Sequence, residues 1–353
     1  MKKKVFLENF PAYFAYLFSG LAFFSLPTSS ESFVGTLISY LLVLAVVFSA
    51  LEALFLLKKQ ADELPCGRAE KLFDFIPPLF CASLFSFFTK SFAKELPLIS
   101  KEFDGGRFSH FFVILSLILA LYIGKRGFSS YSGVCIVILP LFVLPNLLTC
   151  FNFLEFGGIK ELENARFFSV SFETTMFADA FLLCAGVTGL FSMQNKNSCE
   201  NRRKGLFWAF LIFSAVIILE GAKYLMWFGA KNLAFINRPD RVMLAQVPFM
   251  NVQELFLFSY YTAYVLKISV FAASARAFVS KTFAKIPEWA SFAAVAAVFY
   301  LFYLFLPFSY SKISAVISFF GLYLYSFGIY TSRIILKKCR SSKISRQQPK
   351  KSK

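Results

Sequence analysis

The sequence predicts an all-α, polytopic membrane protein of ten transmembrane helices. Two observations carry this prediction. Hydrophobic residues make up 58% of the 353-residue chain and charged residues only 16%, against roughly half and a quarter in ordinary globular proteins. The apolar residues also form continuous stretches rather than alternating with polar ones, which excludes a membrane β-barrel. A secreted domain, a disordered protein and a coiled coil are excluded by the same composition.

Ten windows of the chain are long enough to cross a bilayer, for which about 20 apolar residues suffice. The first follows three lysines but has no small-residue cleavage site, so we interpret it as an uncleaved span rather than a signal peptide. Glycine, proline or polar residues separate the windows, which are 9–28, 33–57, 72–92, 108–124, 129–151, 168–192, 205–229, 250–279, 289–307 and 311–336.

Ten spans divide into two halves of five, as in transporters built from inverted repeats. We therefore expect one transmembrane domain over residues 1–336, with repeat one at 9–151 and repeat two at 168–336. Residues 337–353 contain eight cations and no acid. We expect them to form a disordered cytoplasmic tail that associates with anionic membrane lipid.

The formal charge of +17 is distributed unevenly over the predicted loops. With the N-terminus inside, 24 of the 37 Lys and Arg residues fall in inward segments, ten in outward segments and three within spans. Cytoplasmic loops of membrane proteins carry such an excess, so we expect both termini in the cytoplasm. This explanation is preferred to binding of nucleic acid, and no nucleic-acid partner is expected.

The residues that enzymes and metal sites need are scarce. The chain has one histidine, His110, and its seven cysteines are scattered without a C-x-x-C pair, which argues against a zinc site or a disulfide framework. No P-loop, HExxH, GxSxG or paired-carboxylate motif occurs. We expect no enzyme activity, no metal and no cofactor.

The first span contains a possible break. Gly20 lies near mid-depth and Pro27 follows one to two turns later, as a discontinuous helix requires. Backbone groups freed at such a break can bind a cation or zwitterion. The alternative is that Gly20 only allows close helix packing. The ligand-binding candidates here are Ser19, Gly20, Leu21, Ala22 and Phe23.

The sixth span opens the second half, where an inverted repeat places the partner of the first break. Its segment 171–179 contains two acids and several hydroxyl groups, which are costly against lipid and are expected to face a cavity or a protein neighbour. We take Glu173, Thr174 and Thr175 as ligand-binding candidates. Alternatively, Glu173 lies in the outer headgroup region.

The eighth span carries a polar stripe. Spacings of three and four place its members on one helical face, and these are Tyr260, Tyr264, Lys267, Phe271 and Ser274. Lys267 is more than a dozen residues from the end of the window, too deep for easy snorkelling, so we take it and Tyr264 as ligand-binding candidates. We expect the Lys267 ammonium to bind the opened backbone of the first span in place of a sodium ion. The alternative is a salt bridge to Glu173, Asp179 or Glu52.

A second intramembrane lysine lies in the seventh span. Glu220 and Lys223 are three residues apart, so they face the same side of a helix and are expected to neutralise each other. A role in packing or in a subunit contact is preferred to a role in ligand binding.

Five segments of the chain resemble the spore germination permease family of the amino acid–polyamine–organocation superfamily. The most distinctive is 249–271, where Glu254 precedes an aliphatic and aromatic run that ends in Lys267-Ile268-Ser269. The sequence departs from the family pattern at four places: Ala22 replaces its second glycine, Glu173 lacks its preceding glycine, and family arginines are replaced near Tyr131-Ser132 and at Val252. The other segments are 20–27, 122–127, 144–159, and 227–229 together with 237–239.

The resemblance implies a ten-helix 5+5 bundle and the B-type subunit of a germinant receptor. Such a subunit binds a small germinant, here an amino acid, in a cavity between spans one, three, six and eight. It works in the inner membrane of the spore with an A-type subunit and a lipoprotein C-type subunit. A proton- or sodium-coupled amino acid transporter is the alternative, and a purely structural scaffold is a third possibility.

Overall fold

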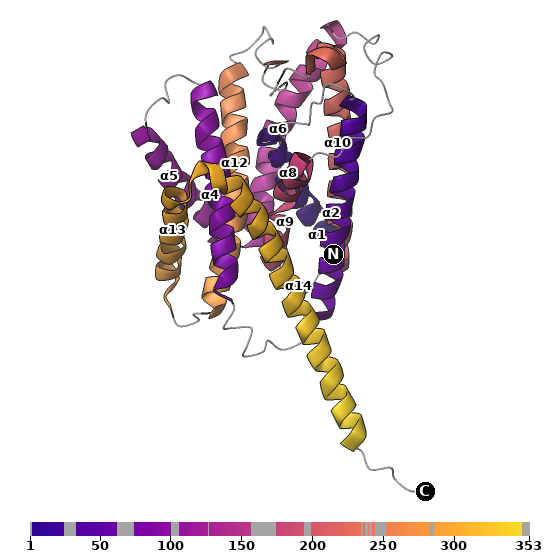
Figure 1. Ribbon diagram of the computed structural model, residues 1–353, viewed down its shortest axis with the longest axis vertical. Helices are drawn as coiled ribbons and strands as arrows, with labels where there is room; N and C mark the ends of the chain where they lie inside the picture. The colour runs from indigo at the N-terminus through magenta and orange to yellow at the C-terminus, as the bar shows by residue number, and fades with distance from the viewer. Residues whose placement is uncertain are drawn as a thin grey trace.

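The computed structural model describes residues 2–24, 33–61, 74–99, 106–125, 127–156, 174–193, 199–233, 236, 239, 242–243, 252–282 and 286–347. In these ranges the chain is helical and contains no β-strand. The helices stand side by side in one bundle, and only the last one extends far beyond it (Figure 1). The predicted all-α class is confirmed for the described residues.

Each predicted window contains a helix or a broken pair of helices. The first contains α1 (Lys2–Phe18) and the 3₁₀ helix η1 (Ser19–Ala22), and the sixth contains α8 (Thr174–Cys184) and α9 (Val187–Ser192). The other first-half helices are α2 (Phe33–Ala61), α4 (Ile76–Ile99), α5 (Gly106–Lys125) and α6 (Phe128–Phe156). The other second-half helices are α10 (Cys199–Leu233), α12 (Val252–Thr282), α13 (Glu288–Phe305) and α14 (Phe308–Gln347).

Six of the described helices are long and apolar enough to cross a membrane: α2, α4, α10, α12, α13 and α14. Helices α5 and α6 meet at a bend of 119° and pass the same test only as a pair, which raises the number to seven. The chain therefore has the helices of a polytopic membrane protein. Some windows contain no helix that is long and apolar enough to cross a membrane on its own. They include the two interrupted ones, α1–η1 and α8–α9.

Helix α12 is the centre of the bundle. It contacts α4, α5 and α13 along its length and also touches η1, α9, α6 and α1. All five members of its predicted polar stripe are buried, with at most 1% of each residue exposed. These residues therefore face protein, as do all residues from 263 to 275 of this helix, whichever face they lie on.

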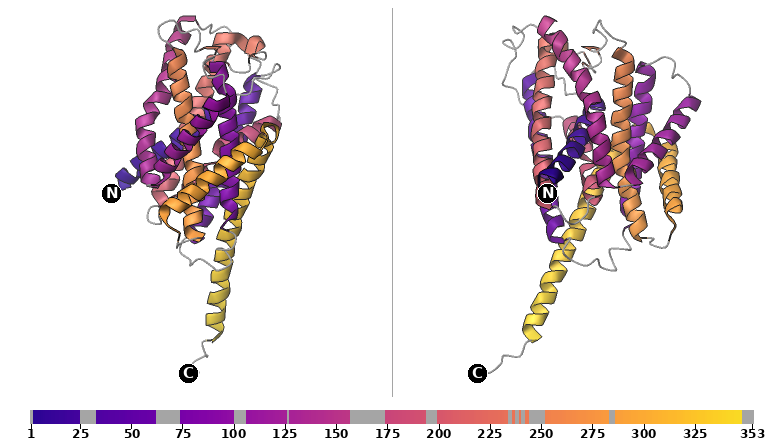
Figure 2. Two further views of the ribbon diagram at one scale, coloured as in Figure 1. Left: turned by 90° about the vertical axis from the view of Figure 1, so that its left-hand side faces the viewer. Right: turned by 180° about the vertical axis from the view of Figure 1, so that it is seen from behind.

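Helix α14 continues to Gln347 and so includes the first eleven residues of the segment 337–353, which the sequence predicted to be a disordered tail. The difference has a simple cause, because no glycine or proline interrupts the chain between Lys337 and Pro349. A helix that begins in the bundle can therefore propagate into the basic segment. Both views of Figure 2 show this part of α14 projecting away from the other helices.

Candidate functional site

The first span is interrupted where the sequence predicted, at Gly20. Helix α1 ends at Phe18, and the chain tightens into the 3₁₀ turn η1. The Gly20 carbonyl accepts hydrogen bonds from the N–H groups of Phe23 (2.9 Å) and Phe24 (3.0 Å). The Ser19 hydroxyl donates to the Tyr16 carbonyl at 2.8 Å. These backbone acceptors are thus satisfied within the span rather than left open.

The other candidates in this turn are less enclosed than Ser19 and Gly20, which are buried. Leu21, Ala22 and Phe23 are half-buried at the end of η1. The Phe23 ring packs against Tyr260 of α12, with 5.2 Å between ring centroids. This stretch therefore joins the first span to the central helix.

The sixth span is also interrupted, but later than predicted. Helix α8 begins at Thr174 and runs unbroken to Cys184, so Thr174 and Thr175 lie in regular helix. The break falls at Ala185 and Gly186, before α9 begins at Val187. Glu173 lies outside the described residues. The sequence analysis placed the break at 171–179 because hydrogen-bonding side chains gather there. The structure places the break at a glycine in an apolar stretch instead.

Tyr16 of α1 connects the two breaks. Its hydroxyl accepts a hydrogen bond from the Gly186 N–H at 2.5 Å. A Cβ atom at Gly186 would collide with this hydroxyl oxygen, because it would lie closer than real Cβ contacts allow. Glycine is therefore required at the second break because the tyrosine of the first span occupies the space of a side chain.

The Lys267 ammonium lies between the same elements. Its Nζ donates a hydrogen bond to the Leu183 carbonyl of α8 at 3.0 Å, and it stands 3.5 Å from the centroid of the Tyr16 ring. A Cβ atom at Gly20 would lie 3.3 Å from the same Nζ. The residue is fully buried. One amine from α12 thus contacts the sixth span and the first span together.

Elementary electrostatics identifies the contacts that offset part of the cost of burying the amine there. Leu183 lies in the last turn of α8, where carbonyl oxygens have no partner within the helix and the helix dipole is negative. The face of an aromatic ring also attracts a cation. The break in the sixth span therefore creates an acceptor, and the tyrosine of the first span completes a site for an ammonium group.

The partner of Lys267 differs from the one predicted. Its hydrogen bond goes to the sixth span, while the first span contributes a ring face and the close approach at Gly20. Two of the alternative salt-bridge partners bind other cations: Asp179 pairs with Lys312 at 2.7 Å and Glu52 with Arg203 at 3.1 Å. The third, Glu173, lies outside the described residues.

An aromatic layer covers the ammonium on the predicted outer side. Tyr264, a predicted site residue, belongs to this layer: its hydroxyl shares a hydrogen bond with Thr89 at 3.1 Å and its ring stacks on Phe92 at 4.5 Å. Phe23 packs edge-on against Phe88, with 5.1 Å between the centroids. We define the aromatic layer as Phe23, Phe88, Phe92, Tyr260 and Tyr264.

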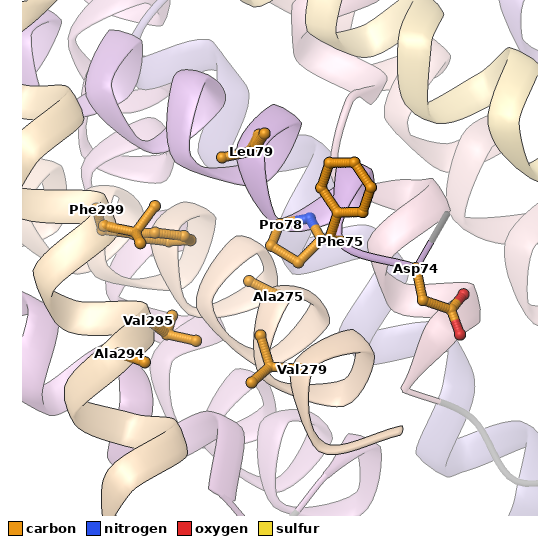
Figure 3. Close-up of a pocket in the computed structure, with 10 residues that line it drawn as sticks. Asp74, Phe75, Pro78, Leu79, Ala275, Val279, Ala294, Val295 and Phe299 are labelled. Carbon is orange, nitrogen blue, oxygen red and sulfur yellow. The ribbon is translucent and has the colours of Figure 1, made fainter. Parts of the chain in front are cut away.

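A cavity of about 190 Å³ lies elsewhere, between α4, α12 and α13. Its lining is apolar and includes Pro78, Ala275 and Val295 (Figure 3). Asp74 stands at its edge and accepts a hydrogen bond from the Tyr325 hydroxyl at 2.7 Å. In Figure 3 its carboxylate points away from the other labelled residues. This cavity belongs to spans three, eight and nine, not to the predicted set of spans one, three, six and eight.

The second intramembrane lysine behaves as predicted. Lys223 Nζ donates to Glu220 Oε1 at 2.8 Å, and both side chains are buried, at 3% and 7% exposure. The two charges lie one turn apart on α10 and neutralise each other. Among the residues that the structure describes, no three histidine, cysteine or acidic side chains gather as a metal site would require.

Three contributors to the site were not anticipated from the sequence. Gly186 carried the same signal as Gly20, a glycine within an apolar window that opens a repeat. Tyr16 is one turn before Gly20, but nothing in the sequence distinguishes it from the other tyrosines. Leu183 acts through its backbone carbonyl, which carries no sequence signal at all.

Comparison with protein-family models and with curated protein sequences finds no match for this chain. Its function is therefore inferred from the residues and geometry described above.

Proposed function

We propose that this protein is the membrane subunit of a spore germinant receptor. It binds a small germinant, an amino acid, between the two interrupted spans and passes the resulting change to A-type and lipoprotein C-type partner subunits. The observation that carries the proposal is the contact of Lys267 with both breaks. A ligand that enters there competes with internal contacts of the protein, so binding is coupled to conformation.

The packing of the helices supports the underlying 5+5 arrangement. An inverted repeat matches α1 with α8–α9, α2 with α10, α4 with α12, α5 with α13 and α6 with α14. Under this match the α1–α10 contact corresponds to α8–α2, and both occur. Three further contacts each have a counterpart in the other half under this match. These are α5–α12 with α13–α4, α1–α6 with α8–α14, and α14–α4 with α6–α12, and all six contacts occur.

The proposal places both termini in the cytoplasm and the chain in the inner membrane of the spore, following the charge bias and the family resemblance. In this orientation the aromatic layer separates Lys267 from the outer face. A germinant from outside then reaches the ammonium only when the layer opens.

A thermal-shift screen over amino acids, nucleosides and sugars on the purified chain tests ligand binding. A ligand at 100 times its dissociation constant stabilises the bound state by about 2.7 kcal/mol, which is readily measured. We expect an amino acid to raise the unfolding midpoint in a concentration-dependent way. If no compound of the three classes does so, the receptor proposal fails.

Substitution of Gly20 tests whether the breaks form the site. A Cβ atom there would meet Leu183 Cγ at 3.0 Å and Lys267 Nζ at 3.3 Å, so Gly20→Leu fills the space around the ammonium. We expect the variant to reach the membrane but to lose the ligand-dependent thermal shift. Gly133→Leu is the matched control, because a Cβ atom at Gly133 has no neighbour within 4 Å. A normal shift in Gly20→Leu would contradict the assignment.

An amino acid transporter coupled to protons or sodium is the alternative. The same two breaks support it, with Lys267 as the group that gates ion coupling. Proteoliposome uptake distinguishes the two functions. Sustained accumulation of a labelled amino acid identifies a transporter, whereas saturable binding without flux identifies a receptor.

A further inference from the structure

The apolar cavity between α4, α12 and α13 lies near one end of each of these helices. Its lining comes from the start of α4, the last two turns of α12 and the second and third turns of α13 (Figure 3). On α13 the outermost lining residues, Ala294 and Phe299, lie about 9 and 17 Å from the first residue. One leaflet contributes roughly 15 Å of hydrocarbon, so the cavity lies at the depth of acyl chains.

The mouth of the cavity opens to the outside of the bundle. Of its lining residues, Phe75 and Leu79 are 55% and 41% exposed, and Ala294 is exposed as well. The volume of about 190 Å³ exceeds the roughly 150 Å³ of an engineered apolar cavity that binds benzene, so part of a hydrocarbon chain fits. If the cavity stays empty, its lining loses dispersion contacts. The lining is therefore suited to an acyl chain of the surrounding lipid.

Three charged side chains lie beside the cavity and closer to the helix ends. Arg276 follows the lining residue Ala275 on α12, and its guanidinium pairs with Glu288 and donates to the Lys125 carbonyl at 3.0 Å. Lys125 Nζ lies 3.7 Å from the same carboxylate. Among the described residues, two cations thus share one acid, and the cluster has a net positive charge.

The depth and exposure of this cluster suit a lipid headgroup. Glu288 is the first residue of α13 and lies about 9 Å before Ala294 along the helix. The Lys125 and Glu288 side chains are 49% and 55% exposed, so a group at the membrane surface can reach them. The orientation proposed above makes this surface the cytoplasmic one, since these helix ends adjoin the basic segments 58–71 and 281–285.

We propose that the cavity and the charged cluster together form a binding site for one anionic phospholipid. One acyl chain occupies the cavity, and the phosphate binds to Lys125 and Arg276 through charge-assisted hydrogen bonds. Cations at a membrane surface attract anionic lipids, whereas the ammonium of an ethanolamine headgroup is disfavoured beside a net positive cluster. The inference requires only that the chain spans a membrane, and it is independent of the germinant proposed above.

Native mass spectrometry of the purified full-length protein tests the headgroup. Dioleoyl phosphatidylglycerol and dioleoyl phosphatidylethanolamine are titrated separately, and the dissociation constant of the first bound lipid is measured. We expect the phosphatidylglycerol to bind at least fivefold more tightly, and Lys125→Gln to reduce this preference at least threefold. Lys312→Gln is the matched control, because Lys312 is also a partly exposed cation paired with a carboxylate. It should preserve the preference.

Filling the cavity tests the position of the acyl chain. Ala294 and Ala297 are both exposed on α13, but of the two only Ala294 lines the cavity. Ala294→Phe should weaken phosphatidylglycerol binding at least tenfold, whereas Ala297→Phe should leave it within twofold of the wild type.

A cross-linking experiment on the wild-type protein tests the same position without a variant. The probe is phosphatidylglycerol with a photoreactive diazirine in its acyl chain. We expect adducts at positions 75–79 or 294–299, and we expect unlabelled phosphatidylglycerol to compete them away.

Different results would overturn the two parts of the proposal. If the two lipids bind within twofold of each other, or if Lys312→Gln lowers the preference as much as Lys125→Gln, the headgroup assignment is wrong. If the competed adducts fall only outside the lining, or if Ala294→Phe binds the lipid normally, the acyl chain does not occupy the cavity. If Ala294→Phe instead converts a dimer into a monomer in the same spectra, the cavity is a contact between copies of this chain, and the lipid site is wrong.

Discussion

Lys223 and Lys267 both lie buried in membrane-spanning helices of this protein, and their surroundings differ. Lys223 is paired with Glu220 on its own helix, so its charge is neutralised within one turn. Lys267 contacts a backbone carbonyl of α8 and a ring of α1, both contributed by other parts of the chain. The first lysine therefore stabilises one helix locally, whereas the second joins three elements and depends on their relative positions.

The largest effect on stability is expected at the local pair. Lys223→Met leaves the Glu220 carboxylate without its cation in a buried position, which costs about 3–5 kcal/mol. Chemical unfolding in detergent should measure this loss. The added substitution Glu220→Gln removes the charge and should restore most of the stability. If the single variant is as stable as the wild type, the two charges are not as closely coupled as the structure indicates.

A smaller loss of stability is expected at Lys267, although this residue is the more deeply buried. Lys267→Met leaves only the neutral Leu183 carbonyl without its donor, at a cost of about 1–3 kcal/mol. Ligand binding should show the opposite order: Lys267→Met should weaken it more than Lys223→Met does. A stability loss greater than that of Lys223→Met would show that Lys267 has a charged partner.

The aromatic layer should contribute less again. Tyr264→Phe removes the hydrogen bond to Thr89 but keeps the stacking on Phe92, so we expect a loss of about 0.5–1.5 kcal/mol. Thermal unfolding measures it. Tyr310→Phe is the matched control, because Tyr310 is 63% exposed and its hydroxyl should not contribute. Equal effects of the two variants would contradict the role of the Tyr264 hydroxyl.

The smallest effect is expected at the ion pair between α8 and α14. The Asp179 and Lys312 side chains are 24% and 42% exposed, and such partly solvated pairs contribute at most about 1 kcal/mol. Asp179→Asn should lower the unfolding midpoint slightly, and added salt should reduce the difference from the wild type. A loss that is independent of salt would mean that the pair acts through packing instead.

The sequence predicted those features that depend on side-chain chemistry and regular spacing. A window of apolar residues predicts a helix wherever it occurs, and each of the ten windows contains one or a broken pair. The burial of Lys267 followed from its distance to the nearest end of its window. The pairing of Glu220 with Lys223 followed from their separation of three residues.

The parts of the site that could not be predicted depend on the backbone or on tertiary contact. Any residue has a carbonyl group, so the acceptor at Leu183 becomes recognisable only when α8 ends beside it. The requirement for glycine at 186 arises from Tyr16, which is 170 residues away in the chain. The polar cluster at 171–179 attracted the prediction because its chemistry is visible in the sequence.

The length of α14 has a mechanical consequence. Its 40 residues, at 1.5 Å each, give a rod about 60 Å long, twice the roughly 30 Å thickness of the hydrocarbon region. The near end of this rod touches α8 through Lys312, and the far end stands clear of the bundle. A tilt of about 5° of the whole rod moves its far end by about 5 Å at 1.5 Å per residue, so a small movement at α8 is amplified along α14 into a larger one at its C-terminal end.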